Sequence, residues 1–126
     1  MKTYHKIFKI KAGSDEVYNA LTKPFSIELW SGEKAVMEEK ENTLFSLFDG
    51  DIAGLNIEFV KDKKIVQEWF FGDREERSIV TMILNPSPTS TSIELTHTNI
   101  PDDSFDEIKF GWENYYFGAL KDFFHH

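Results

Sequence analysis

The last quarter of the chain carries apolar side chains at spacings of three and four residues, the period of an amphipathic helix. We predict one long helix that begins after residues 100–103 (Ile-Pro-Asp-Asp). Either aspartate can cap this helix, and Ser104 with Glu107 has the spacing of a capping box. The apolar stripe consists of Phe105, Ile108, Trp112, Tyr115, Tyr116, Leu120 and Phe123. Such a helix needs a large apolar surface to lie against.

Alternating apolar and polar positions before this helix predict strands with one buried and one solvated face, as in an antiparallel sheet. The predicted strands are residues 6–12, 34–37, 44–48, 52–60, 65–71, 78–84 and 91–98. In the last of them Ile93, Leu95 and His97 share one face. Gly54, inside a predicted strand, marks a bulge or a close approach of another group to the backbone.

Breaks in the alternation predict the remaining elements. Residues 61–64 and 72–73 are predicted turns, and residues 85–88 a loop because they contain two prolines. Ser14, followed by two acidic residues, begins a short helix, and Pro24 opens a second one. The order of one strand, two short helices, further strands and a long helix predicts a single α+β domain over residues 1–126. We expect a curved antiparallel sheet of about six or seven strands around the C-terminal helix.

Composition and charge exclude several classes of function. The chain has no cysteine, which excludes disulfides and thiolate chemistry. Its net charge of −8 argues against nucleic-acid and anionic-membrane partners, because both require a basic surface. The residues after Met1 lack the apolar core of a signal peptide, and no apolar run is long enough to cross a bilayer. We therefore expect a cytoplasmic protein, and we assign no function to the terminal His125-His126 pair.

Motifs for catalysis or metal binding are missing from the sequence. The four histidines lack the spacing of a zinc site, and there is no nucleophile elbow, phosphate loop or dinucleotide fingerprint. We predict no catalytic residue, metal or cofactor. His97 is the one histidine expected to face the helix. We favour a hydrogen-bonded side chain at the edge of a cavity over a catalytic or ligand-contacting role.

Aromatic residues carry the main functional hypothesis, since twelve Phe, four Tyr and three Trp make up 15% of the chain. Bulky rings with a few polar groups can line a ligand pocket between helix and sheet, or they can fill a core. The sequence leaves both alternatives open. The candidate ligand-binding residues are the possible cavity walls and polar handles: Trp30, Phe45, Gln67, Trp69, His97, Trp112 and Tyr116.

Phe110 and Phe117 lie seven residues apart and project to one side of the predicted stripe. Either the helix is buried over a broad arc, which we slightly favour, or these rings form an exposed ridge that binds a partner or a second copy. Gly111 and Gly118 lie on the opposite flank, where they permit close approach to the sheet or mark a bend.

Several segments resemble a known family. They are residues 17–22 (Val-Tyr-Asn-Ala-Leu-Thr), 28–32 (Glu-Leu-Trp-Ser-Gly), 45–50, 63–69 and 111–116 (Gly-Trp-Glu-Asn-Tyr-Tyr). Together they resemble the START-like (SRPBCC) helix-grip superfamily and, within it, the Aha1-like family named for the activator of the heat-shock-protein-90 ATPase. The resemblance spans essentially the whole chain and implies the helix-grip fold of the birch-pollen allergens. The chain looks like the C-terminal-type domain of the two-domain activators, in which the N-terminal domain carries the main stimulating activity.

These features are compatible with three functions. The first is a non-catalytic binding protein that holds a small hydrophobic ligand between the sheet and the C-terminal helix. The alternative is a stress-related, co-chaperone-like interaction module whose partner is a chaperone or a second copy of the chain. The least favoured is a cyclase- or hydrolase-like enzyme, which would need convergent polar groups deep in the pocket.

Overall fold

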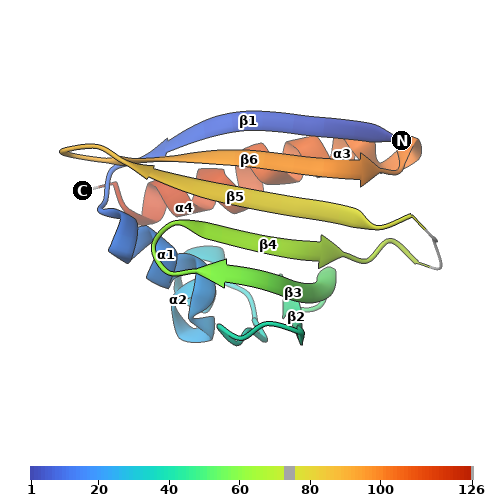
Figure 1. Cartoon of the computed structure of the whole chain (residues 1–126), viewed down its shortest axis with the longest axis horizontal. Helices are drawn as coiled ribbons and strands as arrows, with labels where there is room; N and C mark the ends of the chain where they lie inside the picture. Colours follow the sequence, from blue (N-terminus) through green and yellow to red (C-terminus); the bar gives the residue numbers. More distant parts are fainter. Residues whose placement is uncertain (73–75, 126) are drawn as a thin grey trace.

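Residues 1–72 and 76–125 are described by a computed structural model, and over these residues six strands form one antiparallel sheet (Figure 1). The strand order is β1-β6-β5-β4-β3-β2. The strands are β1 (Lys2–Ile10), β2 (Thr43–Leu47), β3 (Ile52–Val60), β4 (Lys64–Trp69), β5 (Ser78–Pro86) and β6 (Thr91–Ile100). Their alternating burial explains why they form, because each strand turns one apolar row toward a common core.

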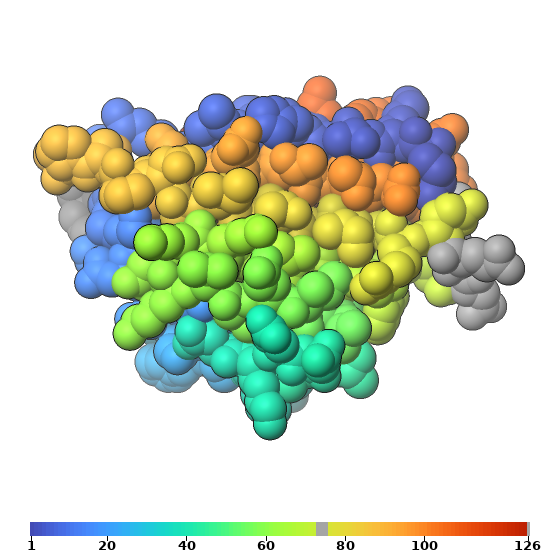
Figure 2. Space-filling view, viewed as in Figure 1, coloured from blue at the N-terminus to red at the C-terminus, as the bar shows by residue number. Residues whose placement is uncertain are grey.

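All helices described lie on one side of this sheet. Two short ones, α1 (Ser14–Thr22) and α2 (Pro24–Ser31), follow β1. The C-terminal helix runs behind β1, β6 and β5 in Figure 1. From the same viewpoint, Figure 2 shows the outer face of the sheet, whose side chains hide most of that helix. The predicted fold class is confirmed: a curved antiparallel sheet holds a long C-terminal helix, with two short helices after the first strand.

Some predicted elements differ from the structure. The strand expected at residues 34–37 is reduced to a single bridge between Val36 and Ser46. β5 continues to Pro86, inside the predicted loop, because a strand end tolerates a residue without an N–H. The capping box is absent: Ser104 makes no side-chain capping bond, since Asp102–Ser104 forms a separate 3-10 turn. Of the turn predicted at residues 72–73, Gly72 adopts a φ of 66°, whereas Asp73 lies outside the described residues.

Gly54 fits the prediction of a close approach rather than a bulge. A side chain there would collide with the carbonyl oxygen of Glu68 and would lie 2.7 Å from the Phe45 ring. The irregularity in β3 falls two residues later, between Asn56 and Glu58. The absence of a side chain at Gly54 therefore lets the Phe45 ring lie against the backbone of the next strand.

The C-terminal helix is not a continuous α-helix. Its segments are η1 (Asp102–Ser104), α3 (Phe105–Phe110), the π-helical η2 (Gly111–Tyr116) and α4 (Phe117–Phe123). The Phe117 N–H donates to the Trp112 carbonyl, five residues back, instead of four. A π turn accommodates one extra residue, so the residues after it are rotated by about 100° relative to a regular helix.

Because of this rotation, Phe110 and Phe117 do not lie on the same side of the helix as predicted. Phe110 is 54% exposed, whereas Phe117 is fully buried and stacks on Phe8 with ring centroids 4.3 Å apart. The two rings therefore form neither a ridge nor one broad buried arc. Tyr115, assigned to the buried stripe, is 63% exposed, and Phe117 occupies the buried side after the π turn.

Replacing Gly118 with alanine is expected to lower the free energy of unfolding by about 1–3 kcal/mol, as overpacking does. Its Cβ would lie 2.8 Å from the carbonyl oxygen of Glu113, which the π turn brings close. Gly111→Ala is the matched control in the same helix, because its Cβ would meet nothing within 4 Å. That change should stabilise the protein by up to about 1 kcal/mol. Urea denaturation measures both, and equal effects of the two substitutions would contradict this geometry.

Candidate functional site

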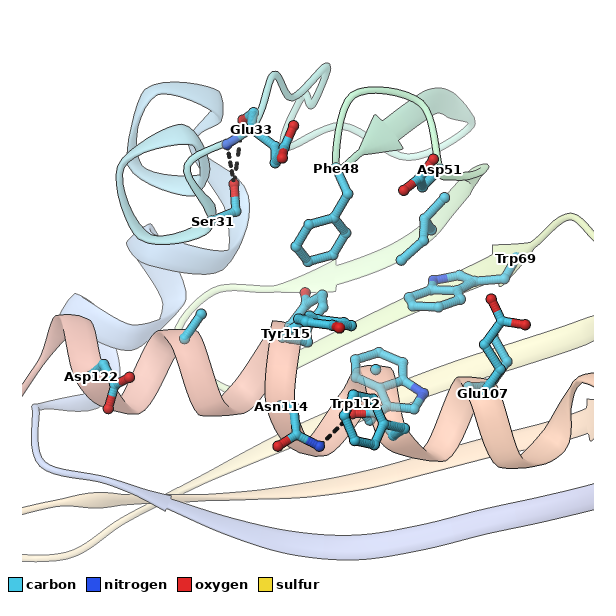
Figure 3. A pocket seen from close by; sticks show the side chains of 16 residues that line it. Ser31, Glu33, Phe48, Asp51, Trp69, Glu107, Trp112, Asn114, Tyr115 and Asp122 are labelled. Carbon is cyan, nitrogen blue, oxygen red and sulfur yellow. Dashed lines mark hydrogen bonds between the residues drawn. The ribbon is translucent and has the colours of Figure 1, made fainter.

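The C-terminal helix forms one wall of an open groove of about 930 Å³ (Figure 3). The opposite wall comes from the end of α2 and from the turn between β2 and β3, and Trp69 of β4 lies between them. The lining residues are Ser31, Glu33, Phe48, Asp51, Ile52, Trp69, Glu107, Ile108, Phe110, Gly111, Trp112, Asn114, Tyr115, Tyr116, Ala119 and Asp122. Four segments that are distant in the sequence thus build one concave surface.

Stacked rings form the floor of the groove. Trp112 stacks on Trp69, with centroids 4.6 Å apart, and contacts Tyr116 at the same distance. Tyr116 in turn packs against Trp30 at 5.1 Å, and Trp112 stacks on Phe117 at 5.5 Å. These rings occupy the space between helix and sheet below the groove. The π turn brings Phe117, five residues after Trp112, onto the same buried side of the helix.

His97 lies beneath these rings, in a line of hydrogen bonds that runs from Trp112 to the backbone carbonyl of Thr98. The Trp112 indole N–H donates to His97 Nδ1 (3.0 Å), and His97 Nε2 is 2.8 Å from Ser78 Oγ. Ser78 Oγ donates to the Thr98 carbonyl (2.9 Å), so its hydroxyl proton is already used. His97 must therefore be the neutral tautomer with its proton on Nε2. Burial lowers its pKa to about 3, and both ring nitrogens are occupied within the protein.

Gln67 belongs to a second buried polar chain. Its amide nitrogen donates to Asn56 Oδ1 (3.1 Å), and its amide oxygen accepts from the Trp69 indole N–H (3.1 Å). Asn56 Nδ2 donates to the Glu38 carbonyl (3.2 Å). Asn56 was not predicted as a site residue, although it lies two residues from Gly54 and so on the same inward face. This network ties β3 to β4 and fixes the orientation of Trp69.

The predicted ligand-binding residues divide into two groups. Trp69, Trp112 and Tyr116 line the groove, whereas the other four lie outside its lining and are buried. The four are Trp30, Phe45, Gln67 and His97. Of the predicted partner-binding pair, only Phe110 reaches the groove.

Several groove residues were not predicted from the sequence. Phe48 was assigned to the end of a strand, but its φ of 54° places it in the turn, from which its ring points toward the helix (Figure 3). Tyr115 was assigned to the buried stripe. The acidic lining residues carry no local motif that marks them: Glu33, Asp51, Glu107 and Asp122.

The charged side chains that line the groove within residues 1–72 and 76–125 have one sign. Among its lining residues there are four carboxylates and no lysine, arginine or histidine. Tyr116 adds a polar group at the floor: only 3% of the residue is exposed, and its hydroxyl has no hydrogen-bond partner among the described residues. Burial raises the pKa of Tyr116, so its hydroxyl stays protonated and can donate a hydrogen bond.

Glu113 anchors the far side of the π segment to the edge strand β1. Its carboxylate accepts a hydrogen bond from the Tyr4 hydroxyl (2.6 Å) and lies 3.4 Å from Lys6 Nζ. The bond from Tyr4 and the charge of Lys6 together lower the pKa of Glu113. The helix wall of the groove is therefore held at the same segment where its backbone departs from the α-helix.

Within residues 1–72 and 76–125, no cluster of three or more metal-ligating side chains is present. None of the helices in that part of the chain is both long and apolar enough to span a membrane.

A curved antiparallel sheet closed by a C-terminal helix defines the helix-grip class of α+β domains. The model of the family described as "Activator of Hsp90 ATPase homolog 1-like protein" matches residues 11–125. The chain belongs to this family.

Two relatives are named as activators of the ATPase of the 90 kDa heat shock protein. The chain is 28% identical over 109 residues to the mouse activator of 90 kDa heat shock protein ATPase homolog 2, covering 85% of this chain and 33% of the relative. It is 25% identical over 112 residues to human homolog 1, covering 87% and 33%. The chain thus spans about a third of the length of these relatives.

Solved structures share the fold over nearly the whole chain. An HSP90 activator from Plasmodium falciparum is 27% identical with a TM-score of 0.86, covering 96% of this chain and 94% of that one. The solution structure of the Aha1 dimer from Colwellia psychrerythraea has the same TM-score at 18% identity, covering 98% and 96%. At that identity the second likeness supports the fold alone.

Proposed function

We propose that this chain is a co-chaperone-like interaction module that binds an Hsp90-type chaperone and modulates its ATPase. The observation that carries the proposal is the contrast between a filled interior and an open aromatic groove. Rings fill the space between helix and sheet, whereas Phe110 and Tyr115 are exposed at the groove. Exposed aromatic side chains that line a concave surface are typical anchors of protein interfaces. Family membership and the names of the relatives support a chaperone as the partner.

Stimulation of an ATPase requires more than binding. A partner shifts a conformational equilibrium only by its difference in affinity for the two states, and a tenfold shift takes about 1.4 kcal/mol. Two exposed rings that contact the chaperone in only one of its two states can supply a difference of that size, because loss of a single hot-spot aromatic costs about 2 kcal/mol or more. The proposal includes a cytoplasmic role in the stress response. A second copy of the chain is the alternative partner.

A small apolar ligand is the second candidate, and one observation favours it. The groove volume of about 930 Å³ falls within the range of small-molecule sites, about 300–1,000 Å³. Its floor offers Trp69, Trp112 and Tyr116. The ligand expected from the sequence would then lie in the open groove rather than deep between sheet and helix.

Titration of the purified chain into a purified Hsp90-type chaperone tests the proposal by calorimetry and by the chaperone's ATPase rate. We expect saturable binding and a changed rate. Phe110→Ser with Tyr115→Ser should weaken binding at least tenfold, as loss of interface anchors does. Phe25→Ser is the control, since Phe25 is 72% exposed but lies on α2 outside the groove. Absence of binding, together with native mass spectrometry showing one apolar molecule per chain, would favour the second candidate instead.

A further inference from the structure

The carboxylates of the groove are spread along it rather than gathered at one point. Glu107 and Asp122 lie near opposite ends of the helix wall (Figure 3). They are fifteen residues apart, which corresponds to about 22 Å along a helix. Glu33 and Asp51 face them from the other wall. The ion pairs found among the described residues use other acids, so no lysine or arginine of this part of the chain neutralises these four.

The floor of the groove holds a hydrogen-bond donor without a partner. Every buried side-chain nitrogen or oxygen of the described residues has a partner, so the unpartnered Tyr116 hydroxyl must still reach solvent. Tyr116 lines the groove, and we infer that its hydroxyl reaches solvent there. An incoming carbonyl oxygen could accept its proton, whereas a purely apolar ligand would leave the hydroxyl without a partner and desolvated.

Exposed rings lie beside these charges. Phe110 and Tyr115 contact each other edge to face, with centroids 5.6 Å apart. Their remaining surfaces face solvent and can contact apolar side chains or the cationic head of lysine or arginine. A surface that combines dispersed carboxylates, aromatic faces and an unpartnered hydroxyl donor is complementary to a chain carrying basic groups, apolar groups and carbonyl oxygens.

We propose that the groove binds a basic amphipathic segment of a partner polypeptide, with lysine or arginine side chains on the four carboxylates. The Phe110–Tyr115 pair receives its apolar side chains, and the Tyr116 hydroxyl donates to one of its backbone carbonyls. The distance between Glu107 and Asp122 matches about seven residues of extended chain or about fifteen of helix. A small organic amine would reach only part of this length. The inference rests on the proposed function and specifies the chemistry by which a chaperone would be recognised.

Two synthetic peptides of twelve residues test this chemistry directly. One alternates lysine with leucine and phenylalanine, and the other carries glutamate in place of every lysine. Fluorescence anisotropy should show the lysine peptide binding at least tenfold more tightly than the glutamate peptide. Its affinity should fall as salt increases, because exposed charge pairs are screened. Equal binding of the two peptides would overturn the inference.

Two neighbouring acids provide a matched pair of variants. Glu107 lines the groove, whereas Asp106, which is also exposed and lies in the same helical turn, does not. Glu107→Gln should lower the affinity for the lysine peptide at least threefold, and Glu107→Gln combined with Asp51→Asn should lower it at least tenfold. Asp106→Asn should leave the affinity unchanged, and an equal loss in this variant would contradict a site in the groove. Circular dichroism confirms that each variant is folded.

The inference and the proposed function fail in different ways. If the chaperone binds the wild type and Glu107→Gln equally well, the proposed function stands and the basic-segment inference is wrong. If the lysine peptide binds in the groove but the chaperone does not, the groove chemistry stands and the proposed function is wrong. If tryptamine binds as tightly as the peptide and with the same dependence on Glu107, the inferred polypeptide partner is wrong and the groove binds a small organic cation.

Discussion

Trp112→Ala is expected to lower the free energy of unfolding by about 3–5 kcal/mol, the range for loss of a buried tryptophan. Trp112 is 2% exposed and lies between Trp69 and Phe117, with centroids 4.6 and 5.5 Å away. Its removal leaves a cavity in this stack and also leaves His97 Nδ1 without its donor. Both losses occur where the helix meets the sheet, so the groove floor should be lost together with stability.

Two further variants separate the ring from its hydrogen bond. Trp112→Phe keeps an aromatic ring but leaves His97 Nδ1 unpaired, which should cost about 1–3 kcal/mol. Tyr115→Ala, three residues away and exposed, should change stability by no more than about 0.5 kcal/mol. Guanidinium denaturation measures all three. Similar effects of Trp112→Ala and Tyr115→Ala would show that Trp112 is not part of the core.

Stability should fall by about 2 kcal/mol between pH 7 and pH 5 because of His97, at 1.36 kcal/mol per unit of pKa difference. The folded pKa of about 3 lies below the unfolded value of 6.5, so the unfolded chain binds a proton first as the pH falls. The contribution of neutral His97 is therefore complete above pH 6.5 and is lost progressively between pH 6.5 and pH 3. Denaturation curves at half-unit steps from pH 7.5 to pH 5 measure this slope.

The histidines provide the control for this pH dependence. His97→Gln should flatten the slope between pH 7 and pH 5, although it also lowers stability at pH 7 by disrupting the bonds to Trp112 and Ser78. His5→Gln should leave the contribution of His97 to the slope in place, because His5 contacts Glu94 and not the Trp112–His97–Ser78 chain. An unchanged slope in His97→Gln would contradict the buried neutral histidine.

The sheet was predictable because its alternation is long and regular. The strand predicted at residues 52–60 coincides with β3, and Ile93, Leu95 and His97 share the buried face of β6 as expected. The strand prediction for residues 34–37 was wrong because four residues, three of them apolar, fit a strand or an irregular segment equally well. There the backbone of Val36 makes only one bridge, at the edge of the sheet.

The C-terminal helix was predicted as an element, but its inner face was not. A period of 3.6 residues places Phe110 and Phe117 on one side of the helix, and no residue in 111–116 signals that a π turn interrupts this period. One extra residue per turn is enough to exchange the burial of Tyr115 and Phe117. Gly118 is consistent with the π turn, because a side chain there would clash with the Glu113 carbonyl that the turn displaces toward it.

The groove could be predicted only in part. Trp69, Trp112 and Tyr116 were expected to face the boundary between helix and sheet, and they line the groove floor. Its acidic character depends on Glu33, Asp51, Glu107 and Asp122, which come together only when α2, the β2–β3 turn and the helix are assembled. Such a long-range juxtaposition leaves no periodicity or local motif in the sequence.

Backbone amide NMR of the labelled chain during titration with a purified Hsp90-type chaperone tests most directly whether the groove is the contact surface. We predict that shift changes and line broadening concentrate at the groove, at Asp51, Glu107, Phe110 and Tyr115. The exposed outer face of the sheet, represented by Ile7 and Ile83, should remain unchanged. Changes confined to that outer face, or no change at saturating chaperone, would contradict an interaction module that works through this groove.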